Sequence, residues 1–267
     1  MSDNHNVAVP PRKRVGSHPN LAVVIPMYNE VSGAKSCVEC LLNALPALSV
    51  PSALIVVNDG SKDGTDKALD DLFAARGGFI LVHQENRGYG GALIRGGREA
   101  AARGYDYVLF MDSDLTNPPD HIERFIPAML AGYDLIKGSR LMQGGDMDAV
   151  PWNRRIFTIA GNAVARTLFR MGIADCTNGF RAIRTELFVS MPLTERGFAV
   201  IVEELYWAKR QAASATSVPT SLKARTTKQR TTSFEYRPAV FWGYLKYALR
   251  ASLVITRARP PIAWVSE

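Results

Sequence analysis

The chain has 267 residues, of which 47% are hydrophobic and 21% are charged, as in a globular protein able to bury a substantial core. Its net charge of +7 and isoelectric point near 9.4 favour an anionic partner such as a nucleotide, a nucleic acid or a membrane surface. Its three cysteines are too few for a disulfide framework, which fits a reducing compartment.

The N-terminal residues 1–19 are polar, with paired prolines and a cluster of three basic residues, and we expect a disordered arm. This segment lacks the apolar core of a signal peptide, so we expect no export signal. No uncharged apolar run in the chain reaches the ~18 residues typical of a spanning helix. We therefore expect a protein that does not cross a membrane.

Five short apolar runs are predicted as strands, separated by stretches of helical character. They are LAVVIP (21–26), ALIVV (53–57), FILV (79–82), YVLFM (107–111) and YDLIK (133–137). Continuous apolar runs are typical of strands covered on both faces. Strands that alternate with helices predict one α/β domain with a mainly parallel sheet flanked by helices.

Each predicted strand is followed by a polar, glycine-rich or acidic motif. The motifs are MYNE (27–30), NDGSKDGT (58–65), NRGYGGA (86–92), MDSDLTNPP (111–119) and GSR (138–140). Open α/β sheets bind ligands at the carboxyl ends of their strands. This placement predicts a ligand site at that edge of the sheet.

Asp112 and Asp114 follow the fourth run directly, and Pro118 with Pro119 can open the next helix. Strand alternation puts residues two apart on one side, so both carboxylates can converge on one point. Hard oxygen ligands of this kind suit Mg²⁺ or Mn²⁺ carrying a diphosphate. The alternative is that the two carboxylates only solvate a strand end or cap the next helix.

A dinucleotide-binding site is excluded because Leu93 stands where G-x-G-x-x-G needs its third glycine, and the glycines follow the third strand. The chain also has no G-x-x-x-x-G-K-[ST] sequence, so a P-loop is excluded.

The ordered set of motifs, extended by WNRRIFT (152–158) and DCTNGFRAIR (175–184), resembles family 2 glycosyltransferases with the GT-A fold. It is most similar to the dolichol-phosphate mannosyltransferase group, which includes polyprenyl-phosphate sugar synthases. The resemblance implies a GT-A domain over 20–225, after the arm of 1–19. Residues 226–267 would then form a basic loop, an amphipathic helix and a tail.

This resemblance implies that Pro26, Tyr28 and Glu30 line the nucleotide pocket and that Asp59 hydrogen-bonds to the base. Many relatives have Asp where this chain has Asn58, and nothing in these motifs separates a GDP-linked from a UDP-linked donor. Taken alone, Tyr28 is more simply an ordinary half-buried aromatic at a strand end, and Asp59 is more simply part of an Asp-Gly turn.

The resemblance further implies that Asp112 and Asp114 hold the divalent cation, with Thr116 near them. Arg140, Arg154, Thr158 and Arg225 match positions that hold the acceptor phosphate, although the register of Arg225 against Arg230 is open. Guanidinium groups suit phosphate oxygens. The catalytic set is thus Asp112, Asp114, Arg140 and Arg154. The alternative is that the arginines only lie on the surface.

A phosphate acceptor is already anionic near neutral pH, so it needs no strong general base. Glu203 matches an acidic position of the family, and we leave open whether it is a base or a carboxylate on a helix face. Residues 239–259 mix aromatic with basic side chains, which fits either a helix in the membrane interface or a terminal helix packed on the domain.

The sequence therefore predicts a metal-dependent, inverting glycosyltransferase that moves a sugar from a nucleoside diphosphate to a polyprenyl phosphate. We expect it on the cytoplasmic face of a membrane as a peripheral protein, and we expect no nucleic-acid partner. The alternatives are transfer to a hydroxyl acceptor on the same fold and a non-catalytic nucleotide-sugar-binding protein.

Overall fold

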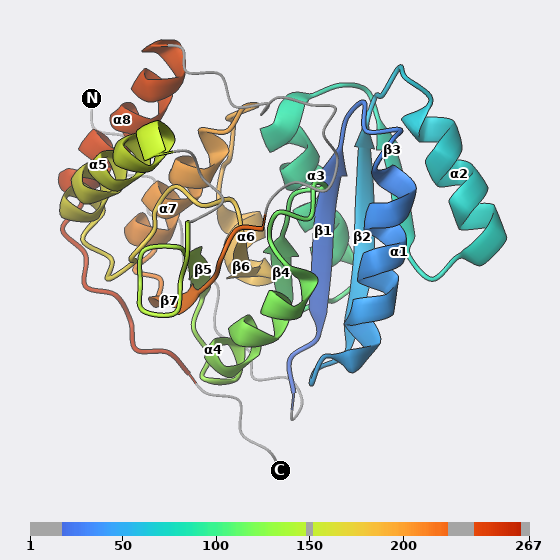
Figure 1. Cartoon of the computed structure of the whole chain (residues 1–267). Helices are drawn as coiled ribbons and strands as arrows, with labels where there is room; N and C mark the ends of the chain where they lie inside the picture. The colour runs from blue at the N-terminus through green and yellow to red at the C-terminus, as the bar shows by residue number, and fades with distance from the viewer. Residues whose placement is uncertain (1–17, 148–151, 224–237, 263–267) are drawn as a thin grey trace.

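The computed structural model describes residues 18–147, 152–223 and 238–262. A seven-stranded sheet runs through this part of the chain in the order β3-β2-β1-β4-β6-β5-β7 (Figure 1). The strands are β1 Leu21–Met27, β2 Ser52–Asp59, β3 Ile80–Gln84, β4 Tyr107–Phe110, β5 Leu135–Ser139, β6 Arg181–Arg184 and β7 Ala215–Pro219. Strand β6 is antiparallel to both β4 and β5, and the other strand pairs are parallel.

Helices cover both faces of the sheet. They are α1 Ala34–Ala44, α2 Thr65–Arg76, α3 Gly88–Ala102, α4 Ile126–Leu130, α5 Trp152–Phe169, α6 Thr185–Ser190, α7 Val200–Arg210 and α8 Pro238–Ser252, with 3₁₀ helices η1 Leu45–Ala47 and η2 Pro119–Phe125. Alternate residues of β1 enter two separate cores, because neighbouring strand residues point to opposite faces. One core includes α1, α2, η2 and α4, and the other includes α3, α5, α6, α7 and α8.

The predicted mainly parallel sheet flanked by helices is confirmed, and all five predicted strands are present in order. Three details of the prediction were wrong. The fourth strand ends at Phe110, before Met111; most of the glycine stretch lies inside α3; and the C-terminal helix ends at Ser252. Strands β6 and β7 were not predicted.

The sheet places a topological switch beside β1, because β2 lies on one side of it and β4 on the other. In doubly wound sheets such a switch opens a crevice at the carboxyl ends of the strands. The motifs that follow β1, β2 and β4 therefore meet at one edge. Within the described ranges, no helix combines the length and the apolar character that crossing a bilayer requires.

Candidate active site

The loop after β1 is tied to the loop after β2 by hydrogen bonds. The backbone N–H of Asn29 donates to Ser61 Oγ at 3.0 Å, and that of Glu30 donates to Thr65 Oγ1 at 2.8 Å. Asn29 itself adopts φ 54°, a left-handed conformation that asparagine tolerates better than most residues. The two loops thus form one wall, on which Tyr28 remains 39% exposed.

Asp59 lies at the end of β2 and is buried. Its Oδ1 accepts hydrogen bonds from Gln84 Nε2 at 2.6 Å and from the backbone N–H of Arg87 at 2.8 Å. Asp59 therefore orders the segment that leads into α3, in addition to any contact with a ligand. The structure places it with Pro26, Tyr28 and Glu30 at the carboxyl ends of β1 and β2.

The departure at Asn58 has a physical explanation in its two partners. Its Oδ1 accepts from Ser61 Oγ at 2.6 Å, and its Nδ2 lies 2.9 Å from His83 Nδ1. An amide offers both an acceptor and a donor, whereas an ionised carboxylate offers acceptors only. Asn58 is thus suited to linking the turn after β2 with β3.

Asp112 and Asp114 lie in a turn beyond β4, so strand alternation does not place them. Tyr89 donates its hydroxyl to Asp112 Oδ1 at 3.0 Å. Thr116 donates to Asp114 Oδ1 from its backbone N–H at 3.1 Å and from Oγ1 at 2.8 Å. Each carboxylate is therefore oriented by a separate neighbour. Thr116, which the resemblance placed near the two carboxylates, thus orients one of them.

The charge of Asp114 acts on the buried thiol of Cys37 in α1. Burial raises the pKa of the Cys37 thiol on α1 strongly, and the charges of Cys40, Asp114 and Glu30 raise it further. Asp114 and Glu30 therefore act on the same thiol, so both carboxylates lie on the α1 side of the site.

The charge of Asp112 acts on Tyr244 of α8. Burial raises the pKa of Tyr244, the charges of Arg181 and Arg140 lower it, and the charge of Asp112 raises it. Arg140 and Asp112 thus share one electrostatic neighbourhood. The sheet order places the turn after β4 between the motifs that follow β1 and β2 and Arg140, which follows β5. We call the first the nucleotide side, after the role that the resemblance implies for it, and the second the arginine side.

The carboxylates of Asp112 and Asp114 fit a cation whose remaining ligands come from a substrate and from water. No cluster of three or more His, Cys, Asp or Glu side chains suited to a metal occurs in the ranges that the structure describes. Mg²⁺ is usually bound by one or two carboxylates together with substrate phosphates and water. Two oriented carboxylates match that pattern, and a closed protein-only metal cage does not exist in this part of the chain.

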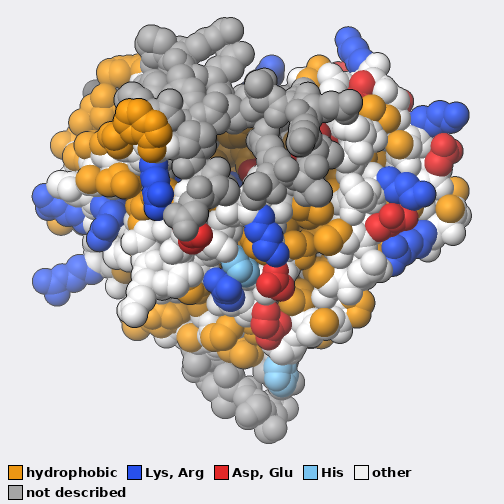
Figure 2. Space-filling model, in the orientation of Figure 1, with side chains coloured by type: hydrophobic (Ala, Val, Ile, Leu, Met, Phe, Trp, Pro, Cys, Tyr) orange, Lys and Arg blue, Asp and Glu red, His pale blue; other side chains and the backbone are white. Residues whose placement is uncertain are grey.

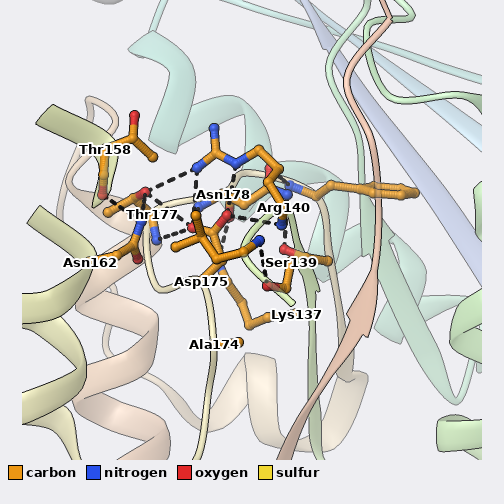
Figure 3. Close-up of polar contacts among 12 residues, drawn as sticks. Lys137, Ser139, Arg140, Thr158, Asn162, Ala174, Asp175, Thr177 and Asn178 are labelled. Atoms are coloured by element: carbon orange, nitrogen blue, oxygen red, sulfur yellow. Dashed lines mark hydrogen bonds and ion pairs between the residues drawn. The ribbon is translucent and has the colours of Figure 1, made fainter. Parts of the chain in front are cut away.

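Arg140 follows β5 and is held by a carboxylate from the loop before β6 (Figure 3). Its Nε donates to Asp175 Oδ2 at 2.7 Å, and its Nη2 donates to Asp175 Oδ1 at 3.1 Å and to Thr177 Oγ1 at 3.2 Å. Asn162 of α5 donates to the same Thr177 Oγ1 at 3.0 Å and to the Thr158 carbonyl at 3.0 Å. Arg140 and Thr158 are therefore brought together, on either side of Thr177.

The remaining predicted phosphate ligands are only partly placed. Arg154 lies in the first turn of α5, one helical turn before Thr158, and its side chain lies outside the described structure. Arg225 and Arg230 also lie outside the described residues. The last described residue before them, Lys223, donates its backbone N–H to the Thr116 carbonyl at 2.8 Å.

A buried group of charges lies beneath this site, and the sequence pattern did not identify it. Arg181 of β6 is fully buried, forms a bidentate ion pair with Glu204 of α7 and lies over the Phe110 ring at 4.6 Å. Lys137 of β5 is fully buried and donates to the Asn178 carbonyl. Burial, and then the charge of Arg181, lowers the pKa of Lys137 from 10.5 to about 7.

Glu203 is an anchor within the fold. Its two carboxylate oxygens accept from the backbone N–H groups of Thr194 and Glu195, from Thr194 Oγ1 and from the Tyr247 hydroxyl, at 2.9 to 3.1 Å. The side chain is buried. These contacts orient the loop before α7 and do not direct Glu203 toward a ligand.

Comparison with known proteins agrees with this architecture. A family model described as glycosyl transferase family 2 matches residues 22–190. A polyprenol monophosphomannose synthase of Mycolicibacterium smegmatis is 31% identical over 208 residues, which is 76% of this chain and 77% of that protein. An undecaprenyl-phosphate mannosyltransferase of Micrococcus luteus is 30% identical over 206 residues, which is 76% of this chain and 83% of that protein.

Among solved structures, glucosyl-3-phosphoglycerate synthase from Mycobacterium tuberculosis superposes with a TM-score of 0.60 at 22% identity, over 93% of this chain and 88% of that one. A structure of the same enzyme with Mn²⁺, UDP and glucosyl-3-phosphoglycerate has a TM-score of 0.59 at 21% identity, over 89% of this chain and 81% of that one. At this identity the likeness shows the fold alone. The family model covers most of the chain and the mannosyltransferases align with three quarters of it, and on that basis this glycosyltransferase belongs to glycosyl transferase family 2.

Proposed function

We propose that this enzyme transfers a sugar from a nucleoside-diphosphate donor to a polyprenyl phosphate, with inversion at the anomeric carbon. The observation that carries the proposal is the position of Arg140. Asp175 and Thr177 hold its guanidinium beside α5, and the same loop reaches Asp112, since a Cβ added at Gly179 would lie 3.6 Å from Asp112 Oδ2. A fixed guanidinium is well suited to phosphate oxygens, and the relatives named above act on polyprenyl phosphates by name.

On the donor side, Pro26, Tyr28 and Glu30 would line the nucleotide pocket, with the Tyr28 ring supporting the base. An aromatic face supports any base, so we propose a GDP- or UDP-linked donor without choosing between them. Asp59 would contact the base while it orders the segment before α3.

Asp112 and Asp114 would hold Mg²⁺ or Mn²⁺ on the donor diphosphate, between the nucleotide side and the arginine side of the site. A divalent cation bound there would stabilise the charge of the leaving nucleoside diphosphate. Solved structures of the fold with Mn²⁺ and UDP, or with Mg²⁺ and UDP, support divalent metal use.

On the acceptor side, Arg140, Arg154, Thr158 and Arg225 would hold the phosphate. This phosphate is already anionic, so it can attack the anomeric carbon without a strong base. The four donor groups that hydrogen-bond to Glu203 favour the same mechanism, because they leave its carboxylate in a structural role. Lys223, the last described residue before Arg225, donates its backbone N–H to the Thr116 carbonyl at 2.8 Å.

We further propose that α5 and α8 lie on the lipid surface that carries the acceptor. Large apolar side chains are exposed on both helices and just beyond α8, namely Trp152, Ile156, Ile159, Val164, Trp242, Leu245, Leu249, Leu253 and Ile255. Figure 2 shows hydrophobic side chains gathered over α5 and α8, with Lys and Arg side chains beside them. The opposite face of α8 packs into the core through Tyr247, Ala248 and Ala251.

A helix with one face in the core and apolar and cationic side chains on the other suits an anionic membrane surface. We therefore propose that α8 serves both roles considered for residues 239–259: one face packs on the domain, and the other lies in the membrane interface. We place the protein on the cytoplasmic face, as a peripheral protein. The predicted division into an arm, a catalytic domain over 20–225 and a C-terminal segment remains part of this proposal.

The test is to incubate the purified protein with Mn²⁺, a panel of nucleotide sugars and a short polyprenyl phosphate, and to analyse the products by mass spectrometry. A polyprenyl-phosphate-sugar adduct is expected, and the productive donor then identifies base and sugar together. Donor hydrolysis without the adduct would contradict the phosphate acceptor and favour a hydroxyl acceptor. Nucleotide binding without donor consumption would favour a binding protein instead.

A further inference from the structure

Tyr89 connects the start of α3 to the carboxylate of Asp112. Its hydroxyl donates to Asp112 Oδ1 at 3.0 Å, and its ring stacks on Phe198 with a centroid distance of 4.5 Å and an interplanar angle of 30°. The hydroxyl and the ring are thus fixed by different partners. The proposed donor and acceptor contacts do not use this residue.

The backbone next to Tyr89 is packed closely against neighbouring loops. A Cβ added at Gly90 would lie 2.0 Å from the Glu195 carbonyl oxygen, and the backbone N–H of Gly90 donates to the Arg196 carbonyl at 2.7 Å. A Cβ at Gly179 would lie 3.2 Å from the Tyr89 hydroxyl and 3.6 Å from Asp112 Oδ2. Two glycines therefore allow the loop before α7 and the loop before β6 to enclose the Tyr89–Asp112 pair.

The Phe198 side of this arrangement is held by α8. Tyr244 donates its hydroxyl to the Phe198 carbonyl at 3.2 Å, and Lys246 and Tyr247 both contact the Glu195 carboxylate. The position of Tyr89 therefore depends on a loop that is fixed from its far side by the C-terminal helix.

We propose that Tyr89 is a positioning residue that holds the Asp112 carboxylate in the orientation in which it binds a divalent cation. This inference rests on the metal role proposed above for Asp112. Ligand-orienting neighbours of this kind typically contribute 10- to 100-fold to metal affinity. Without the hydroxyl, the carboxylate loses the hydrogen bond that orients Oδ1.

The test is a titration of the full-length protein with Mn²⁺, alone and with UDP or GDP. The electron paramagnetic resonance signal of the unbound Mn²⁺ measures how much of the ion has bound. Tyr89→Phe keeps the stacked ring and removes the hydroxyl, and we expect its Kd for Mn²⁺ to rise about tenfold or more. Phe198→Leu, which removes the stack, should raise the Kd by a smaller factor. Transfer by Tyr89→Phe should recover at saturating Mn²⁺, because the substrate contacts are intact.

The matched control is Tyr107→Phe, on the opposite end of β4. Its hydroxyl donates to the Tyr133 carbonyl at 2.7 Å, so its loss affects stability without touching Asp112. We expect Mn²⁺ affinity within about twofold of wild type, smaller than the effect of an orienting neighbour. Equal weakening by Tyr89→Phe and Tyr107→Phe would overturn the inference, because it would show a general loss of stability.

Asp112→Asn separates this inference from the proposed function. If Asp112→Asn loses Mn²⁺ affinity while Tyr89→Phe binds Mn²⁺ as wild type does, the positioning role is wrong and the metal role stands. If Asp112→Asn also binds as wild type does, the metal role itself is wrong, and the inference fails with it.

Discussion

The Asp175 carboxylate binds the Arg140 guanidinium through two hydrogen bonds, at 2.7 and 3.1 Å. The Asp175 side chain is 0% exposed, whereas that of Arg140 keeps 13% of its surface open to solvent. The carboxylate is thus committed to the arginine, and the outer edge of the guanidinium remains available to a ligand. This asymmetry identifies Asp175 as the residue that orients Arg140.

Asp175→Asn should therefore weaken acceptor binding. Loss of the negative charge leaves Arg140 poorly oriented, and we expect the KM for the polyprenyl phosphate to rise about tenfold with a small change in the donor KM. Unfolding free energy should fall by about 3 kcal/mol, because one partner of a buried ion pair is lost. Steady-state kinetics and urea denaturation measure the two effects. Asp70→Asn, in an exposed pair with His83, is the control and should change neither.

The same pair predicts a pH dependence of stability. Burial alone would raise the pKa of Asp175, but the charge and hydrogen bonds of Arg140 outweigh it and lower the pKa below its ordinary value of 3.8. A carboxyl whose pKa is lowered on folding stabilises the native state above its unfolded pKa and loses that contribution as the pH falls through its folded pKa. The difference in unfolding free energy between wild type and Asp175→Asn should shrink below about pH 4. A constant difference down to pH 2 would contradict the pairing.

Asp114→Ala should abolish transfer and leave the fold intact, because it removes a proposed metal ligand from a turn outside the sheet. A loss of several kcal/mol of charge stabilisation corresponds to a fall in turnover of about 100-fold or more. Asp120→Ala, at an exposed position of η2, is the control and should retain activity. Turnover by the Asp114 variant equal to that of the control would contradict the metal assignment.

Arg154→Ala should raise the KM for the acceptor about tenfold if its guanidinium contacts the phosphate. The donor KM should stay the same, since the residue lies in α5 on the arginine side of the site. Arg166→Ala is the matched control, because this arginine is exposed on the same helix three turns away. Acceptor kinetics that are alike in the two variants would remove Arg154 from the proposed phosphate site.

The apolar surface of α5 and α8 predicts binding to anionic vesicles. Replacing Trp242 and Leu249 by Ser should lower vesicle affinity about tenfold or more, because each side chain buries apolar area in the lipid. Phe73→Ser is the control, since Phe73 is 46% exposed on α2, at the far end of the sheet (Figure 1). Co-sedimentation at low salt measures the effect. A wild-type protein that stays wholly in the supernatant would contradict the membrane proposal.

Lys137→Met should change how stability depends on pH. The native state binds a proton at Lys137 only below about pH 7, whereas the unfolded chain does so up to 10.5. The unfolded state therefore binds more protons between these values, and this lysine makes stability rise with pH by up to about 1.4 kcal/mol per unit.

Denaturation of wild type and Lys137→Met between pH 6 and 9.5 measures this term as the difference between the two proteins. The difference in unfolding free energy between the two proteins should be constant below about pH 7. Above that pH, the wild type should become more stable relative to Lys137→Met. Lys67→Met, at an exposed position of α2, should show no such trend. A flat difference across the whole range would mean that Lys137 titrates as an exposed lysine does.

The sequence predicted the parts of the fold that follow from hydrophobic pattern. Strands β1 and β4 are continuous apolar runs and were predicted to within one residue at each end, whereas β2 extends one residue before and two polar residues beyond the predicted 53–57. Strand β6 was missed because two of its four residues are Arg181 and Arg184, and charged residues predict exposed positions rather than a buried strand. They are buried through ion pairs with Glu204 and Asp134, which are far away in the sequence.

The candidate site was predicted where chemistry follows from neighbouring residues, and missed where it depends on packing. The motif after β4 predicted Asp112 and Asp114, but their alignment on one strand face was wrong because β4 ends at Phe110. Asp175 belonged to a motif already noted, yet its partner Arg140 lies 35 residues earlier. Only the antiparallel entry of β6 brings the two together.

Because β6 runs antiparallel to its neighbours, the loop that precedes it lies at the same edge of the sheet as the loops that follow the parallel strands. The first residue of β6, Arg181, pairs with Phe110 at the end of β4, so the loop before β6 arrives at the same edge from the opposite direction. The donor motifs occupy loops that leave the sheet, whereas Asp175 and Thr177 occupy a loop that returns to it. From the roles proposed above, we expect that replacing residues 140–180 by the matching segment of a relative changes acceptor preference and leaves nucleotide recognition in place.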